Sequence, residues 1–470
     1  MLVFDNINKY ENNNALIAAN EEVITYKALI KFSQNISKNI KNRCLIFLIC
    51  GNNLESISGY LGFSRSNCVV SMIDERISND QLNKLVLIYK PDFIFIKKKQ
   101  KFLTNYSSIY SFYSYELLEL NKKAKVKIED DLFLLLSTSG STGTPKCVRQ
   151  SYNNIYSNTE SILKYLNILE TDITITTLPM SYVYGLSILN THLNRGACIV
   201  LNNHSVIDKK FWTLLEKKKI CSFGGVPYTY QILDKINFEK FNLKHLKYTT
   251  QAGGKLSPTL SKKIINYYKK TDKKFFIMYG AAEATARMSY LPWEYAEQKT
   301  SSVGIPISGG KFWIEDNQRN KILENNKSGE LVFSGKNVCL GYASNVFDLS
   351  KGDENKGILR TGDIAKKDND NFYYITGRKD RYVKIHGNRI NLAELEYIIS
   401  DFGIQSLCQL EKENQITIFI KNLNEIEKLK EYLSKSIQLH PTTFVFKKVN
   451  NFSLNKNYKV SYSNEVSDKL

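Results

Sequence analysis

The chain has 470 residues, of which 43% are hydrophobic and 24% are charged, and its net charge is +19. This length allows two or three domains with a core each, and the balance is that of an ordinary globular protein. No apolar run approaches the ~20 residues that a membrane-spanning helix needs, so we predict no membrane span.

Apolar runs of strand length alternate with helix-length amphipathic segments along most of the chain. The first amphipathic segment, 26–40, precedes a buried run at Ile46, and further apolar runs are 69–73, 93–96, 132–136, 173–178, 197–201 and 275–278. Such alternation predicts a layered α/β architecture with parallel strands. One helix is expected to begin with Ser257 as N-cap and Pro258 at its first position.

The C-terminal part shows a different pattern. We expect strands at 382–385, 406–410, 415–420 and 443–447, one helix that opens at Asn391 and a second at 425–436. Asn391 and Glu394 have the spacing of a capping box. The fold class is therefore α/β, with a large multi-lobed N-terminal domain of layered sheets and helices (1–379) and a small α+β C-terminal domain (380–470).

The most informative motif is the segment 137–146, which is rich in Ser, Thr and Gly and follows the apolar run 132–136. Its glycines let the backbone approach an anion, and its hydroxyl and N–H groups can surround phosphate oxygens. Lys146 adds a mobile positive charge. The order of strand, loop and Pro-Lys predicts a phosphate-binding loop, which is not a Walker loop because no Gly-Lys-Ser/Thr follows four residues after a glycine. The segment resembles the signature loop of the adenylate-forming (AMP-binding) superfamily of acyl-CoA synthetases, luciferases and peptide-synthetase adenylation domains.

Further motifs similar to those of this family recur in order up to residue 459. Segments 178–186, 224–228 and 251–254 resemble the parts that form the acyl pocket. Segment 279–285 resembles the part in which a tyrosine stacks on adenine and a glutamate holds magnesium. Ala282 stands where the family usually has threonine, so one hydroxyl contact is missing, and we take Thr285 or water as its replacement.

Segment 360–363 resembles the ribose clamp of the family, and 377–378 a second ribose contact. Segment 453–459 resembles the loop that carries the catalytic lysine, although Ser453 replaces its proline and Tyr458 its glycine. The role of Lys459 needs a cation, because charge develops on the carboxylate and the α-phosphate as the acyl oxygen attacks.

The resemblance implies a set of site residues. The catalytic residues would be Lys459, Glu283 and Lys146, with Glu283 as metal ligand. Asp380 would be the hinge about which a mobile C-terminal domain turns. The ATP-binding residues would be Thr138, Ser139, Gly140, Ser141, Thr142, Gly143, Gly253, Gly254, Tyr279, Gly280, Asp363 and Arg378. The acyl pocket would be walled by Tyr182, Tyr184, Val226 and Tyr228.

The function that the resemblance implies is an AMP-forming acid–thiol ligase. A carboxylate attacks the α-phosphate of ATP, pyrophosphate leaves, and a thiol then displaces AMP from the acyl-adenylate. The cofactors would be ATP, Mg²⁺ and CoA or phosphopantetheine, and the partners a small-molecule carboxylic acid and, as an alternative acceptor, an acyl carrier protein. No acidic residue lies between Leu178 and Leu189, where amino-acid-activating relatives carry an aspartate, so we predict an acid without an α-amino group.

Three alternatives remain open at this point. One is an amino-acid-activating ligase that serves a carrier protein, and another is a non-catalytic nucleotide-binding relative, suggested by Ala282 and Tyr458. The third is a nucleic-acid-binding protein, suggested by charge alone. The lysines are spread in short groups without a long basic tail or a nucleic-acid module, so we predict no nucleic-acid partner. A lysine-rich surface explains the charge, and attraction of anionic partners is the second interpretation.

Cysteine and histidine usage bears on the compartment. The eight cysteines form no Cys-x-x-Cys pair and the five histidines are isolated. This predicts reduced, mostly buried thiols, no zinc site and a cytoplasmic protein. The first residues have no basic region ahead of an apolar stretch, so no secretory signal is expected.

Overall fold

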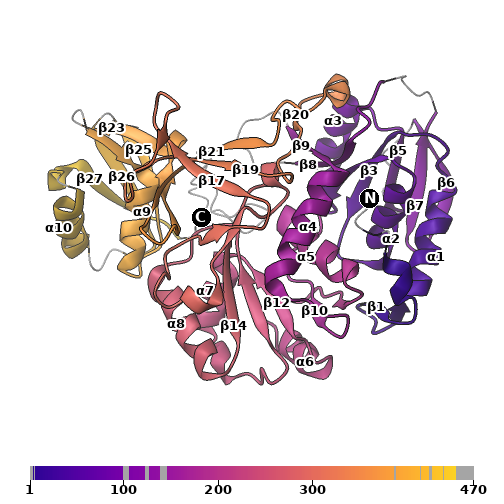
Figure 1. The fold of residues 1–470 in the computed structure, drawn as a ribbon, viewed down its shortest axis with the longest axis horizontal. Coiled ribbons are helices and arrows are strands. Elements are labelled where there is room, and N and C mark those ends of the chain that lie inside the picture. Colours follow the sequence, from indigo (N-terminus) through magenta and orange to yellow (C-terminus); the bar gives the residue numbers. More distant parts are fainter. Residues whose placement is uncertain are drawn as a thin grey trace.

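The computed structural model describes residues 4, 6–98, 105–121, 126–137, 146–385, 388–412, 414–422, 426–437, 439–450 and 452. Figure 1 shows the N-terminal half on the right, a sheet with helices below the centre, and the C-terminal elements on the left.

An eight-stranded sheet forms the N-terminal part. The inner strands pair in parallel (β3 with β4 and β5, and β4 with β8), and the edge strands pair antiparallel. All six residues of the central strand β3 and the first five residues of β8 are buried, as expected for apolar runs covered on both faces. In sheet order the strands are β20 (Gly341–Ala343), β9 (Cys147–Ser151), β8 (Leu132–Ser137), β4 (Val69–Asp74), β3 (Leu45–Cys50), β5 (Phe93–Lys97), β7 (Tyr115–Leu120) and β6 (Tyr106–Phe112).

A nine-stranded sheet follows, with a parallel centre and antiparallel strands at both edges. In sheet order the strands are β16 (Ile305–Pro306), β15 (Ser289–Tyr290), β14 (Lys274–Tyr279), β13 (Tyr248–Gln251), β12 (Ser222–Gly225), β10 (Ile173–Ile175), β11 (Cys198–Val200), β1 (Asn14–Ile17) and β2 (Val23–Thr25).

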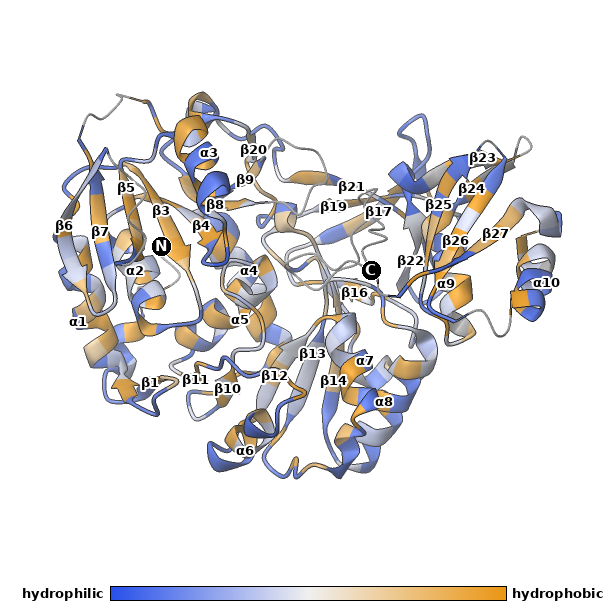
Figure 2. Ribbon diagram, turned by 180° about the vertical axis from the view of Figure 1, so that it is seen from behind, coloured by the Kyte–Doolittle hydropathy of each residue, from blue (hydrophilic) through white to orange (hydrophobic). Residues whose placement is uncertain are grey.

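Helices cover these two sheets. One hydrophobic cluster joins residues of β3 and β8 to α4 (Tyr152–Leu166), α5 (Val183–Asn194) and β11, so α4 and α5 pack between the sheets. A second cluster holds α6, α7 and α8 against the far face of the nine-stranded sheet. Figure 2 shows α8 with its hydrophobic side toward β14 and its hydrophilic side outward. The remaining helices are α1 (Tyr26–Ser37), α2 (Leu54–Arg65), α3 (Asn79–Tyr89), α6 (Lys209–Lys217), α7 (Pro227–Lys235) and α8 (Pro258–Lys270).

A five-stranded antiparallel sheet, which the sequence did not predict, lies beyond β16 in the chain. In sheet order its strands are β18 (Lys321–Ile322), β17 (Lys311–Glu315), β19 (Gly329–Ser334), β21 (Ile358–Lys367) and β22 (Tyr373–Arg378). Strand β21 contains no apolar run, and most of its residues are only partly buried. The apolar periodicity that identifies strands in sequence is therefore absent there.

The C-terminal elements agree with the sequence expectation except for the strand Asn388–Asn391, which was not predicted. They are β23 (Tyr382–Ile385), β24 (Asn388–Asn391), α9 (Leu392–Asp401), β25 (Ser406–Lys412), β26 (Gln415–Ile420), α10 (Ile426–Ile437) and β27 (Phe444–Lys448). A hydrophobic cluster formed only by residues from 383 to 446 is their core. The domain boundary between residues 379 and 380 stays a prediction, and it falls in the 3-10 helix Lys379–Arg381.

Several local expectations are confirmed. Ser257 Oγ accepts a hydrogen bond from the Leu260 N–H at 3.3 Å, and Asn391 Oδ1 accepts from the Ala393 and Glu394 N–H groups at 2.9 and 3.2 Å. All eight cysteines are buried and none forms a disulfide. Two expectations need correction. The strands at 173–178 and 197–201 are shorter than predicted, and the parallel arrangement fails at the sheet edges, where hairpins pair antiparallel.

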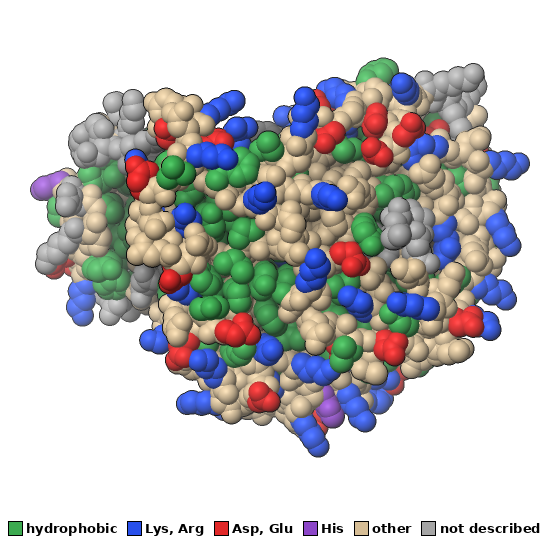
Figure 3. Space-filling model, viewed as in Figure 1, with side chains coloured by type: hydrophobic (Ala, Val, Ile, Leu, Met, Phe, Trp, Pro, Cys, Tyr) green, Lys and Arg blue, Asp and Glu red, His purple; other side chains and the backbone are tan. Residues whose placement is uncertain are grey.

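Two features bear on partners. Among the described residues, no helix is both long and apolar enough to cross a membrane. On the face that Figure 3 shows, Lys and Arg side chains are scattered and interleaved with Asp and Glu. This distribution agrees with a lysine-rich surface rather than with one continuous basic patch.

Candidate active site

One end of the candidate site lies where the nine-stranded and five-stranded sheets meet. Tyr279 ends β14, and its hydroxyl donates to Oδ2 of Asp363 on β21 at 2.5 Å. Asp363 lies opposite Arg378 of β22, whose Nη1 is 3.5 Å from Asp363 Oδ1. The structure thus brings together three of the predicted ATP-binding residues. We call Tyr279, Asp363 and Arg378 the nucleotide end.

Electrostatics at the nucleotide end keep these groups in defined protonation states. Burial, and then the Asp363 carboxylate, raise the pKa of Tyr279 well above its usual range, so the phenol stays protonated and remains a donor. Asp363 is only 14% exposed, whereas Arg378 is about half exposed. A shielded carboxylate with two oxygens can accept from two neighbouring hydroxyl groups, which is the chemistry a ribose requires.

Glu283 lies in the 3-10 helix Ala282–Ala284, which directly follows the nucleotide-end tyrosine. Its Oε1 accepts a hydrogen bond from the Tyr342 hydroxyl at 2.7 Å, and Tyr342 belongs to β20. Gln150 on β9 donates from Nε2 to the Ala282 carbonyl at 2.6 Å. These bonds hold the glutamate against strands β9 and β20.

The backbone after β14 turns sharply. A Cβ at Gly280 would lie 1.7 Å from the Ala286 carbonyl oxygen, so only glycine fits there. Thr285 and Ala286 have φ angles of +59° and +109°, which non-glycine residues rarely adopt. Thr285 Oγ1 donates to the Asn337 carbonyl at 2.6 Å and is buried. Thr285 therefore does not replace the hydroxyl missing at Ala282, because its own hydroxyl is held inside the loop.

The ends of the predicted phosphate loop lie on β8 and β9, and β9 pairs with the strand β20 that carries Tyr342. Ser137 of β8 pairs with Cys147 of β9, so the chain leaves and re-enters the sheet at neighbouring positions. Val148 of β9 lies opposite Tyr342, the partner of Glu283. Lys146 is described and exposed. The predicted residues Thr138, Ser139, Gly140, Ser141, Thr142 and Gly143, and also Lys459, lie outside the described residues.

The predicted glycine pair forms a turn after β13. Gly253 has a φ of +87°, and a Cβ on Gly254 would lie 3.1 Å from Pro227 Cγ. Gln251 Nε2 donates to the Gly254 carbonyl at 2.8 Å and closes the turn. The predicted hinge residue Asp380 is exposed, and its Oδ1 accepts from Arg378 Nε at 3.2 Å.

The four predicted acyl-pocket residues come together in one hydrophobic cluster. Tyr184 and Val226 are fully buried, and Tyr182 and Tyr228 are partly buried. Asn52 fixes the segment before α5, because it donates to the Leu178 carbonyl at 3.0 Å and accepts from the Met180 N–H at 3.1 Å. The role of the four predicted residues as the wall of an acid pocket stays a prediction.

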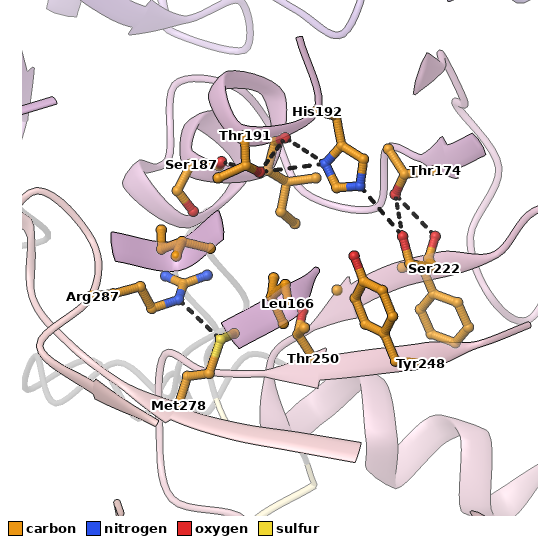
Figure 4. A pocket seen from close by; sticks show the side chains of 14 residues that line it. Leu166, Thr174, Ser187, Thr191, His192, Ser222, Tyr248, Thr250, Met278 and Arg287 are labelled. Carbon is orange, nitrogen blue, oxygen red and sulfur yellow. Dashed lines mark hydrogen bonds between the residues drawn. The ribbon is translucent and has the colours of Figure 1, made fainter. Parts of the chain in front are cut away.

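A small cavity adjoins this cluster, between α4, α5 and the strands β10, β12, β13 and β14. About 10 Å³ of it is open to the centre of a water molecule, which is room for about one water. Figure 4 shows Arg287, His192 and Tyr248 converging on it from different elements. Sequence reasoning missed these three residues. We call Arg287, His192 and Tyr248 the acyl end.

The polar groups of the acyl end are deeply buried. Arg287 is 3% exposed, its Nε donates to Met278 Sδ at 3.2 Å, and its guanidinium carbon is 4.1 Å from the Tyr184 ring centroid. Burial lowers the pKa of His192 to about 4, so the ring is neutral at pH 7. His192 Nδ1 lies 2.8 Å from the Ile188 carbonyl and therefore carries the proton, which leaves Nε2 as an acceptor. The Tyr248 hydroxyl is buried without a hydrogen-bond partner.

The residues present also fit a magnesium ion that binds with its nucleotide. Among the described residues, no group of three His, Cys, Asp or Glu side chains could hold a metal by itself. Mg²⁺ in phosphate sites usually takes one or two carboxylates and completes its shell with phosphate and water. Glu283 would supply one such carboxylate near strand β9, where the predicted phosphate loop re-enters the sheet.

Comparison with known proteins agrees with this geometry. The family model described as AMP-binding enzyme matches residues 3–343, and the chain belongs to this family. An oxalate–CoA ligase of Arabidopsis thaliana is 28% identical over 275 residues, which cover 57% of this chain and 52% of that protein. The chain thus matches about half the length of this relative.

Two further relatives cover more of the chain. A 2-succinylbenzoate–CoA ligase of Bacillus cytotoxicus is 24% identical over 400 residues, covering 82% of this chain and 79% of that protein. The structure of o-succinylbenzoate coenzyme A synthetase from Bacillus subtilis, in complex with ATP and magnesium ion, has a TM-score of 0.76 at 18% identity and covers 97% of each chain. This likeness shows that the two chains share a fold.

Proposed function

We propose that this protein is an AMP-forming acid–thiol ligase, which activates a small carboxylic acid with ATP and transfers the acyl group to a thiol. The observation that carries this proposal is the segment 279–287. In it, Tyr279 bonds to Asp363, Glu283 bonds to Tyr342 of β20, and Arg287 lines the cavity of the acyl end. This stretch of nine residues would thus join the places where we propose that nucleotide, magnesium and acid bind.

The first half-reaction joins the acid to AMP. A carboxylate oxygen attacks the α-phosphorus of ATP, the bond to the β-phosphate oxygen breaks, and pyrophosphate leaves with the electron pair. Asp363 would accept hydrogen bonds from the ribose, Arg378 would make a second ribose contact and Tyr279 would stack on adenine. Glu283 would hold Mg²⁺, which supplies charge neutralisation at the phosphates when bound. Lys146 and Lys459 would add positive charge at the same phosphates.

The second half-reaction transfers the acyl group. A thiolate attacks the acyl carbon, the bond to the phosphate oxygen breaks, and AMP leaves. No covalent enzyme intermediate is required, so catalysis rests on positioning and charge stabilisation. CoA is the favoured acceptor, because the oxalate and 2-succinylbenzoate ligases are CoA ligases by name. The phosphopantetheine of a carrier protein is the alternative acceptor.

The test is a panel of carboxylic and amino acids, each assayed for pyrophosphate release with ATP and Mg²⁺, with and without CoA. We expect acid-dependent pyrophosphate release and, with CoA, stoichiometric AMP and thioester. A holo carrier protein in place of CoA distinguishes the two acceptors. Absence of acid-dependent pyrophosphate release across the panel would overturn the proposal and leave a nucleotide-binding role.

A further inference from the structure

The two fully buried arginines of the described chain differ in how they are neutralised. Arg149 on β9 is 0% exposed, and its Nη2 is 2.6 Å from Glu354 Oε2. Its Nε and Nη2 also donate to the carbonyls of Tyr342, Leu340 and Gly352, each at 3.1 Å. Every side of this guanidinium therefore meets an acceptor, as expected for a buried charge.

Arg287 lacks such partners. Its Nε donates to a thioether sulfur, which is a weak acceptor, it also interacts with the neutral Tyr165 hydroxyl, and its guanidinium lies on the face of the Tyr184 ring, so none of these partners carries a negative charge. Among the described residues, no carboxylate forms an ion pair with it. Arginine stays protonated in proteins, so the charge cannot be relieved by loss of a proton. A buried, unpaired guanidinium in a cavity indicates that its counter-ion comes from outside the chain.

The other two residues of the acyl end, Tyr248 and His192, also agree with a counter-ion that comes from outside the chain. Tyr248 is 6% exposed and presents to the same cavity a hydroxyl that makes no hydrogen bond of standard geometry and has only the Ser222 hydroxyl as a weak neighbour. A hydroxyl and a guanidinium can both donate to one carboxylate. Because His192 is neutral, it adds no second charge that would need a counter-ion. Thus the acyl end offers one positive charge and one unsatisfied donor.

We propose that the acid which this protein activates carries a second carboxylate, bound by Arg287 and Tyr248, so that the substrate is a short dicarboxylic acid. This inference rests on the proposed function and names its substrate class. The cavity has room for about one water molecule, so the group that enters must be small and must replace that water. The sign of the charge also disfavours an α-amino acid, because its ammonium group would meet a guanidinium.

The first experiment compares acids of equal chain length. Propanoate, butanoate and pentanoate are paired with propanedioate, butanedioate and pentanedioate, and kcat/KM is measured by pyrophosphate release. A buried group built to bind a charged substituent rejects the analogue that lacks it, so we expect at least one diacid to exceed its partner by about 100-fold or more. Equal or better turnover of the monoacids would overturn the inference, while the proposed function would stand.

The second experiment changes the charge in the cavity. Arg287→Met keeps the length of the side chain and should lower kcat/KM for the best diacid by about 100-fold, with less than about fivefold change for the monoacid. Arg287→Lys keeps a charge without the planar fork and should retain part of the preference. Arg319→Met removes one charge from the exposed turn between β17 and β18 and should leave the preference unchanged. If a folded Arg287→Met variant lost kcat/KM equally for both acids, the role of Arg287 would be structural and the inference would be contradicted.

Binding without turnover separates this inference from the proposed function. The best diacid should raise the melting temperature of the wild type, and neither the monoacid nor the Arg287→Met variant should show this shift. If no acid is turned over but the diacid still stabilises the wild type through Arg287, the proposed function fails and the site remains. If no diacid stabilises the protein and none is turned over, the dicarboxylate site is refuted as well.

Discussion

At the nucleotide end, Asp363 bonds to both Tyr279 and Arg378, whereas at the acyl end Arg287 has no carboxylate partner among the described residues and the Tyr248 hydroxyl makes no hydrogen bond of standard geometry. Both ends are built around a charged residue shielded from water. At the nucleotide end the opposite charge is supplied by the chain, while at the acyl end it is not. A buried polar group whose partners belong to the chain does not destabilise the ligand-free fold. A buried polar group without such partners lowers the stability of the fold until a ligand binds to it. We infer that the acyl end determines specificity for the acid, and that its unpaired groups lower the stability of the fold.

The largest expected effect tests whether the nucleotide side carries the chemistry. Glu283→Gln keeps an acceptor for the Tyr342 hydroxyl but removes the charge for magnesium. We expect pyrophosphate release at limiting Mg²⁺ to fall by about two to three powers of ten, the scale of one lost preorganised charge contact. Tyr342→Phe is the matched control, because it keeps the carboxylate and should cost only about fivefold. A Glu283→Gln rate close to wild type would break the comparison.

Asp363→Asn tests the nucleotide end itself. Two hydrogen bonds from ribose to a charged acceptor contribute about 3 kcal/mol, so the KM for ATP should rise roughly 100-fold, while the KM for the acid changes much less. Asp368→Asn is the control, because that carboxylate pairs with Lys299 instead. Equal increases in both Michaelis constants would show that Asp363 does not act on the nucleotide alone.

His192 allows a test at the acyl end through stability. Its pKa is about 4 in the folded chain and about 6.5 when unfolded, because burial disfavours the charged ring. Between these two pH values the unfolded chain binds a proton that the folded chain does not, so stability falls as the pH falls. The loss should reach about 3 kcal/mol by pH 4. Denaturant unfolding of wild type and His192→Gln from pH 7 to pH 4 should show a weaker pH dependence in the variant, and parallel curves would contradict a neutral buried ring.

The sequence predicted the parts of the molecule whose signals are local. Strands β3 and β8 are continuous apolar runs, and Ser257 and Asn391 cap helices with their own side chains. Tyr279 and Glu283 belong to one short motif, and Asp363 is found in another. Each of these signals lies within about ten residues, so no knowledge of tertiary contacts was needed.

The parts that the sequence did not predict depend on contacts between distant segments. The five-stranded sheet has strands such as β21 without apolar periodicity, and pairing with β19 and β22 determines them. Arg287 stands between Ala286 and Met288 in a buried stretch. Its environment is formed by α4, α5 and four strands that lie up to about 120 residues earlier in the chain. A single arginine in an otherwise buried segment was the one local signal that could have identified it.

The smallest expected effect distinguishes a group kept for a ligand from a group kept for the fold. Tyr248→Phe removes a hydroxyl that has no partner, so the free energy of unfolding should rise by up to about 1 kcal/mol. The same change should lower kcat/KM for the preferred diacid about fivefold, because one donor to its second carboxylate is lost. Tyr268→Phe is the matched control in α8, since the Tyr268 hydroxyl accepts from Thr249 Oγ1 at 3.1 Å. That variant should lose about 1 kcal/mol of stability with no effect on the acid. If Tyr248→Phe instead lowered stability and left diacid kinetics unchanged, the hydroxyl would serve the fold, and the contrast between the two ends would not extend beyond Arg287.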